Sequence, residues 1–169
     1  EVSRIEAGKK TMNFESCSMH SIVEEVVQEL SPLAQERDLN IEFKTSFSEE
    51  NEDITTVNGD RLELRRVVSN LVGNAIKFTD EGKVEISLSE FSDRTQRWVK
   101  LDVEDTGYGI AKEEQKTIFE RFRSGKNKRS GSGLGLHLSK WIAETHNGKI
   151  EFSSELNKGS LFTFLLPRR

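Results

Sequence analysis

Residues 131–146 read GSGLGLHLSKWIAETH, three alternating glycines that lead directly into an amphipathic segment. Glycine has no Cβ, so its backbone can approach a ligand closely. The first amides of a helix lack intrahelical partners and carry the positive end of the helix dipole, which suits them to phosphate. Taken alone, the stretch fits a flexible loop before a surface helix equally well, so other segments have to decide between the two interpretations.

The composition limits the classes of protein that the chain can represent. Its 169 residues are 34% apolar and 32% charged, with a formal net charge of −4, which suits one globular domain with a real core. The acidic balance argues against general nucleic-acid binding. Cys17 is the only cysteine, which excludes an internal disulfide and indicates a reducing compartment. No apolar run approaches the ~20 residues needed to span a bilayer, so we expect a cytoplasmic domain and leave open whether a parent protein is membrane-anchored.

The segment 61–78 is the most informative predicted helix. Asp60 precedes it as an N-cap, with Glu63 three residues later in a capping-box arrangement. Helical periodicity places the apolar residues on one broad stripe: Leu64, Val67, Val68, Leu71, Val72, Ala75, Ile76 and Phe78. Asn70, Asn74 and Lys77 lie together on the other side. Two asparagines and Gly73 are poor helix formers, so this polar face is either a solvated surface or a binding surface.

A second polar signal follows a predicted strand. In residues 83–91 and 97–104, apolar and polar residues alternate, which predicts an antiparallel pair of strands. The second strand leads into DTGYGI at 105–110, where Asp105 would meet a ligand beside Gly107 and Gly109, or would simply form a strand-terminal turn. A basic run, RFRSGKNKR, then comes at 121–129 and precedes the three glycines.

The remaining pattern completes the predicted architecture. A helix tail stops at Gly8, and strands are expected at 11–16, 39–44, 54–57, 149–153 and 160–166. Helices are expected from Ser18 or Ser21 to about Arg37, at 111–122, and at 134–146; the apolar face of the first comprises Ile22, Val23, Val26, Val27, Leu30 and Leu33. This order of helices and strands along the chain predicts an α+β fold. We expect a two-layer sandwich in which a mixed sheet of about five strands is covered on one face by about three helices. GxxxxGK[ST], GxGxxG after a strand, and the HRD and DFG signatures of protein kinases are absent from the sequence.

Four motifs in fixed order resemble those of sensor histidine kinases. NLVGNAIKF at 70–78 resembles the N box, DTGYGI the G1 box, IFERF at 118–122 the F box, and GSGLGL the G2 box. NKGSLFTFLLP at 157–167 is similar to the closing glycine motif, and SRIEAGK at 3–9 to the end of the dimerisation and phosphoacceptor domain. The resemblance covers essentially the whole chain. It implies that residues 1–8 are the end of that domain and that residues 9–169 form a catalytic ATP-binding domain. It also implies the Bergerat fold, which gyrase, MutL repair proteins and heat-shock chaperones share.

The resemblance also implies roles in binding ATP and Mg²⁺. Asp105 would accept a hydrogen bond from the adenine amino group, beside Gly107, Gly109, Ile110 and Ser160. Asn74 would offer its amide oxygen to Mg²⁺, while Asn70 and Lys77 would face the triphosphate. The remaining phosphate contacts would come from the residues Gly131, Ser132, Gly133, Leu134, Gly135 and Leu136. Arg123 would reach the γ-phosphate, with Lys126, Lys128 and Arg129 as alternatives.

The residues favour phosphate transfer to a protein over hydrolysis. The related ATPases carry a glutamate base at the Asn70 position, and an asparagine cannot act as that base. None of the chain's histidines, His20, His137 and His146, has the context of a phosphoacceptor, so we expect the acceptor histidine in an upstream domain. The expected partners are ATP and ADP, the phosphoacceptor domain of the same or a dimer-partner chain, and a response regulator receiver domain. We expect the fragment to be monomeric, its parent homodimeric, and neither to bind nucleic acid. An ATPase domain and a non-catalytic binding module are the alternatives.

Overall fold

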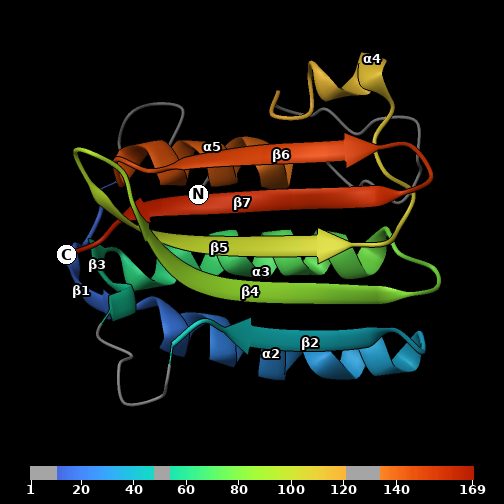
Figure 1. Ribbon diagram of the computed structural model, residues 1–169, viewed down its shortest axis with the longest axis horizontal. Coiled ribbons are helices and arrows are strands. Elements are labelled where there is room, and N and C mark those ends of the chain that lie inside the picture. Colours follow the sequence, from blue (N-terminus) through green and yellow to red (C-terminus); the bar gives the residue numbers. More distant parts are fainter. Residues whose placement is uncertain (1–10, 48–53, 121–133) are drawn as a thin grey trace.

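The computed structural model describes residues 11–47, 54–120 and 134–169. Its centre is a five-stranded mixed sheet in the order β2-β4-β5-β7-β6, and three long helices lie against one face (Figure 1). The strands are β2 (Asn40–Thr45), β4 (Lys83–Ser92), β5 (Arg97–Asp105), β6 (Lys149–Glu155) and β7 (Gly159–Pro167). Only the pair β2 and β4 is parallel. The predicted two-layer α+β sandwich is confirmed.

The helices on the covered face are α2 (Met19–Glu36), α3 (Arg61–Lys77) and α5 (Leu134–Thr145). Helix α3 is the middle one, in contact with α2, α5 and the central strands β4 and β5. A separate two-stranded ribbon pairs β1 (Glu15–Ser18) with β3 (Thr56–Gly59) at one end of the molecule. Among the described residues, no helix is long and apolar enough to cross a membrane.

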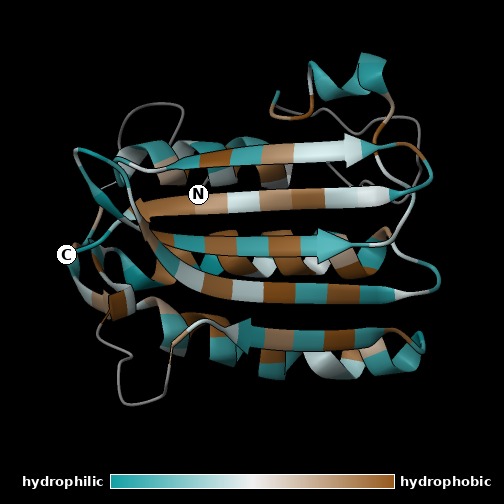
Figure 2. Cartoon of the chain, viewed as in Figure 1, coloured by the Kyte–Doolittle hydropathy of each residue, from teal (hydrophilic) through white to brown (hydrophobic). Residues whose placement is uncertain are grey.

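The core lies between the sheet and the helices because side chains along each strand point alternately toward the helices and away from them. Val84, Ile86 and Leu88 of β4 are fully buried, whereas the residues between them are half-buried. The same alternation is visible along the central strands in Figure 2. The inward side chains meet the apolar stripe of α3, of which Leu64, Val67, Val68, Leu71, Val72, Ala75 and Ile76 are all buried.

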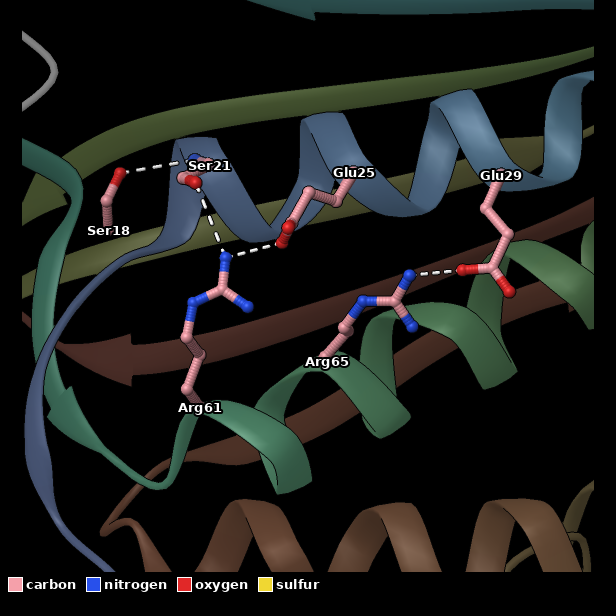
Figure 3. A network of polar contacts seen from close by, with 6 residues as sticks. All are labelled: Ser18, Ser21, Glu25, Glu29, Arg61 and Arg65. Atoms are coloured by element: carbon pink, nitrogen blue, oxygen red, sulfur yellow. Dashed lines mark hydrogen bonds and ion pairs between the residues drawn. The ribbon is translucent and has the colours of Figure 1, made fainter.

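Polar side chains tie α2 to α3 along their exposed edges. Arg61 and Arg65, one turn apart on α3, form ion pairs with Glu25 and Glu29 on α2 (Figure 3). Arg61 also donates to the hydroxyl of Ser21 at 3.4 Å. Exposed pairs of this kind contribute little to stability individually, so they align the two helices while the apolar core supplies most of the stabilisation.

The N-terminus of α3 is capped as predicted, with one change of partner. The Asp60 carboxylate accepts the N–H groups of Glu63 at 3.2 Å and Asn13 at 3.0 Å. In a capping box Glu63 would accept the Asp60 N–H, but here Nε2 of His146 accepts it at 3.0 Å. The C-terminal end of α5 is thereby joined to the first turn of α3.

Several element boundaries differ from the prediction. The predicted strand 11–16 is replaced by β1, because Glu15 to Ser18 pair with β3 and Ser18 caps α2. Residues 54–55 form a short 3₁₀ turn instead of strand, and β3 begins at Thr56. Leu33 is 44% exposed rather than part of the apolar face of α2. Ala34 occupies that face instead, at four-residue spacing from the buried Val26 and the half-buried Leu30.

The helix predicted at 111–122 is also shorter. The structure has α4 (Lys112–Gln115), followed by turns in which Thr117 and Glu120 donate their N–H groups to carbonyls three residues earlier. Ile118 is buried, and Phe119 packs edge-on against Phe152 with ring centroids 5.7 Å apart. Phe122 lies outside the described residues.

We predict that Asp60→Ala lowers the free energy of unfolding by about 1–2 kcal/mol, because it removes a helix cap that also holds Asn13. Urea denaturation followed by circular dichroism would measure the change. Leu62→Ala is the matched control, since Leu62 is 76% exposed in the same helical turn. An equal loss in both variants would contradict the capping role.

Candidate functional site

The predicted polar face of α3 lines an open groove of about 670 Å³. Asn70, Gly73, Asn74 and Lys77 lie along it, and Glu63, Arg65, Arg66, Leu62 and Ser69 continue it toward the start of the helix. Asn74 and Lys77 are half-buried, and the Lys77 ammonium lies 5.7 Å from the centroid of the Phe78 ring. A side-chain amide oxygen and a cation thus face one hollow, a combination suited to an anion and a hard metal ion.

The start of α5 fits against this face without a side chain between them. A Cβ on Gly135 would lie 2.3 Å from Oδ1 of Asn70, so only glycine permits this approach. One turn later, Oγ of Ser139 accepts a hydrogen bond from Nδ2 of Asn70 at 3.0 Å. Sequence reasoning missed Ser139, although its spacing of four from Gly135 places both residues on the same helical face.

Asp105 ends β5 as a nearly buried carboxylate, 8% exposed. Its Oδ1 accepts the N–H of Gly107 at 2.9 Å. Burial raises the pKa of Asp105 to about 6, while hydrogen bonds from the N–H groups of Gly107 and Ser160 act in the opposite direction. Burying a carboxylate is costly, and carboxyl groups with a pKa shifted in this way are typical of functional sites.

The loop after Asp105 is held against the end of α3 and the β6–β7 turn. A Cβ on Gly107 would lie 2.1 Å from the carbonyl oxygen of Phe78, and Phe78 also accepts the N–H of Tyr108 at 3.2 Å. Gly109 has a φ of +70°, and a Cβ there would lie 2.0 Å from the carbonyl oxygen of Glu155. Asp105 is therefore brought to the end of the helix that carries Lys77 and Asn74.

Ser160 and Ile110 lie on the same side of the molecule as Asp105. Ser160 is the register partner of Asp105 across β5 and β7, and its Oγ lies 2.8 Å from that of Ser154. Ser154 accepts the Ile110 N–H at 2.8 Å, and the amide of Gln115 donates to the Ile110 carbonyl at 2.8 Å. Ser154 and Gln115 were not predicted, since nothing in an alternating strand or a short helix distinguishes them.

The structure thus places two groups of predicted residues next to one another. Along the groove lie Asn70, Asn74 and Lys77, with Gly135 against Asn70. Around the loop that contacts the end of α3 lie Asp105, Gly107, Gly109, Ile110 and Ser160. Leu134 begins α5, and Leu136 packs against the core. Arg123, Gly131, Ser132 and Gly133, with Lys126, Lys128 and Arg129, lie outside the described residues. In the described part of the chain, no cluster of three or more His, Cys, Asp or Glu residues could hold a metal ion.

Comparison with known proteins identifies the class. Residues 59–169 match the family of histidine kinase-, DNA gyrase B- and HSP90-like ATPases, and the chain belongs to this family. The catalytic domain of the histidine kinase ThkA is similar in structure, with a TM-score of 0.78 and 30% identity over 93% of this chain and 97% of that domain. Within the family, the chain is therefore a histidine kinase catalytic domain, and its Bergerat fold agrees with the resemblance in the motifs.

Two further relatives extend the comparison. The sensory/regulatory protein RpfC of Xanthomonas campestris is 36% identical over 99% of this chain, which spans 23% of RpfC. Full-length ShkA in complex with AMPPNP gives a TM-score of 0.79 at 27% identity, over 98% of this chain and 33% of ShkA. ThkA has also been solved in complex with the response regulator protein TrrA. The match to that structure has a TM-score of 0.74 and 26% identity, and it covers 99% of this chain and 46% of the matched chain.

We predict that Asp105→Asn stabilises the ligand-free domain at neutral pH. The unfolded carboxyl ionises near pH 3.8 and the folded one near 6, so stability falls as pH rises between these values and stays lower above them. The cost is about 3 kcal/mol at most, which the asparagine avoids.

Urea titrations at pH 4, 5, 6 and 7 would measure this difference between the two proteins. The wild-type domain should lose stability relative to Asp105→Asn across the series, most steeply between pH 4 and 6. A variant that is less stable than the wild type at pH 7 would contradict the burial cost of Asp105.

Proposed function

We propose that this chain binds Mg·ATP in the groove of α3 and supports transfer of the γ-phosphate to a histidine of a phosphoacceptor domain. That domain belongs to the same chain or to a dimer partner. The observation that carries the proposal is the packing of Gly107, which follows the buried Asp105 by two residues, against Phe78, which directly follows Lys77 of the Asn70–Asn74–Lys77 face. Membership of the family and the AMPPNP complex of ShkA support it.

Asp105 has the properties needed to recognise adenine. An ionised carboxylate accepts hydrogen bonds only, and the exocyclic amino group of adenine donates them. With a pKa of about 6, the Asp105 carboxyl is mostly ionised at pH 7. The close approach of Gly107 to Phe78 and of Gly109 to Glu155 fixes the loop that follows Asp105. In the proposed complex, Ile110 of this loop would lie against the face of the base.

The polar face of α3 would hold the phosphates. Lys77 contributes a positive charge, and the Asn74 amide oxygen is a ligand that Mg²⁺ accepts. When bound, Mg²⁺ neutralises charge on the phosphates. Asn70, fixed by Ser139 and Gly135, would lie beside the triphosphate. Transfer then depends on positioning and on neutralising charge, as is usual for phosphoryl transfer.

Two observations favour transfer to another protein segment over hydrolysis. Asn70 has no titratable carboxylate, so it cannot activate water as a general base. His20 and His146 are 8% and 4% exposed, and both ring nitrogens of His146 are engaged, with Asp60 and Ile142. His137 is half-buried within α5 and lacks the sequence context of a phosphoacceptor. We therefore propose that the acceptor histidine lies in an upstream domain. Residues 1–8 would be the end of that domain, and residues 9–169 the catalytic domain.

The wider setting is proposed by analogy with the relatives. ThkA was solved with a response regulator protein, so we propose a response regulator receiver domain as the final phosphate acceptor. The isolated domain would be a monomer in the cytoplasm, and its parent a homodimer. Nucleic acid is not expected as a partner because the net charge is −4.

Gly135→Val is predicted to reduce ATP affinity at least tenfold while the domain stays folded. The new side chain would displace Asn70, whose flexible amide can move without disturbing the core. The same substitution at Gly133, outside the described residues, is expected to act likewise. Isothermal titration calorimetry with Mg·ATP would measure the loss.

Gly73→Ala is the matched control for folding, because a Cβ at Gly73 meets no atom within 4 Å. It should raise the stability of α3 by up to about 1 kcal/mol. Wild-type ATP affinity in Gly135→Val would show that the phosphates do not lie against Asn70.

The chain alone is predicted to bind Mg·ATP without becoming phosphorylated on histidine. Incubation with γ-³²P-labelled ATP should give no acid-labile phosphate, whereas addition of a phosphoacceptor domain from the same parent protein should yield labelled phosphohistidine in that domain. Asp105→Asn should abolish the transfer. Acid-labile phosphate on the isolated chain would contradict the proposed location of the acceptor, and steady-state hydrolysis without phosphohistidine would favour an ATPase.

A further inference from the structure

Two side chains outside the predicted site hold the backbone of Ile110. Its N–H donates to Oγ of Ser154 on β6 at 2.8 Å, and its carbonyl accepts from Nε2 of Gln115 in α4 at 2.8 Å. The Gln115 amide also donates to the Ser154 carbonyl at 3.0 Å. Both main-chain groups of Ile110 are thereby tied to β6, and the three segments form one connected unit.

The hydroxyl of Ser154 lies at the centre of this unit, and its partners fix the direction of every bond. A serine hydroxyl donates once and accepts twice. The Gly159 carbonyl, 3.0 Å away, can only accept, and the Ile110 N–H can only donate. The third partner is Oγ of Ser160 at 2.8 Å. All three contacts are hydrogen bonds at the same time only when Ser160 donates its hydrogen to Ser154.

This assignment decides what Ser160 can offer a ligand. Its only hydroxyl hydrogen is directed at Ser154, so its Oγ remains an acceptor toward other groups. Asp105, Ser160 and Ser154 are successive register partners across β5, β7 and β6, so their side chains lie on the same face of the sheet. Val99, Leu101 and Val103 of β5 are buried on that face with Asp105. Asp105 and Ser160 therefore form a row of two acceptors.

We propose that Ser154 is a specificity-determining positioning residue of the nucleobase pocket, with Gln115 holding the opposite side of Ile110. Because Ser154 accepts the hydroxyl hydrogen of Ser160, Asp105 and Ser160 both present acceptors to the base. These two acceptors select a 6-amino purine and disfavour a 6-oxo purine, whose oxygen is itself an acceptor. This inference rests on the proposed function, because it assumes that Asp105 faces the base.

Ser154→Ala tests the proposal through the relative affinity for ATP and ITP, measured by calorimetry on the same protein. The change frees the Ser160 hydroxyl to rotate and donate, and it releases the Ile110 N–H. We expect ATP affinity to fall about tenfold and ITP affinity to fall less, so that the preference for ATP shrinks at least threefold. Ser154→Thr, which keeps the hydroxyl, should restore the preference to within about twofold.

Ser153→Ala is the matched control, because Ser153 is the exposed neighbour on the same strand and points to the other face of the sheet. It should leave both affinities unchanged. Gln115→Ala should weaken ATP and ITP binding equally, by severalfold, since it loosens Ile110 without altering the Ser160 hydroxyl.

The possible failures are separable. If Ser154→Ala weakens both nucleotides equally, or changes neither, with normal binding by the wild type, Ser154 does not set the preference and the inference is wrong. If the unaltered chain shows no saturable ATP binding, the proposed function fails and this inference with it.

Discussion

Burial of one face of α3 is the constraint on which the structure depends. The stripe from Leu64 to Ile76 packs onto β4 and β5 between α2 and α5, and this apolar contact fixes how the helix is rotated. Since a helix repeats every 3.6 residues, fixing one face also fixes the other. Asn70, Asn74 and Lys77 are consequently held in one line along a groove, so the folding energy of the core also orients the polar residues of the site.

Both ends of α3 are held by segments distant in sequence. At the start, Asp60 joins the chain near Asn13 and the end of α5 through His146. Burial lowers the pKa of His146, and its neutral ring can accept from Asp60 while donating to Ile142. At the other end, Arg37 donates to the Ile76 carbonyl and pairs with Asp80, which accepts from Tyr108. The loop after Asp105 is therefore attached to the same helix that carries Lys77.

Asp105 illustrates a conflict between stability and binding. Its burial disfavours the charged form, yet a charged acceptor is what recognition of an amino group requires. The structure moderates the cost with two backbone N–H donors, from Gly107 and Ser160, and so keeps the carboxylate ionised at neutral pH. Its neighbour Ser160 is oriented in turn by Ser154. The geometry of these two acceptors is thus set by the neighbouring strands.

The sequence by itself determined the periodic features: the two faces of α3, its Asp60 cap, the alternating strands, and the motifs that place Asp105, Asn74 and Gly135 in a histidine kinase catalytic domain. These features follow from local spacing, which a single segment contains. Only the tertiary structure decided the pairing of β1 with β3, the acceptance of the Asp60 N–H by His146, and the roles of Ser139, Ser154 and Gln115. Those contacts join residues between 5 and 86 positions apart, and most of them depend on strand order and helix packing, which no local pattern encodes.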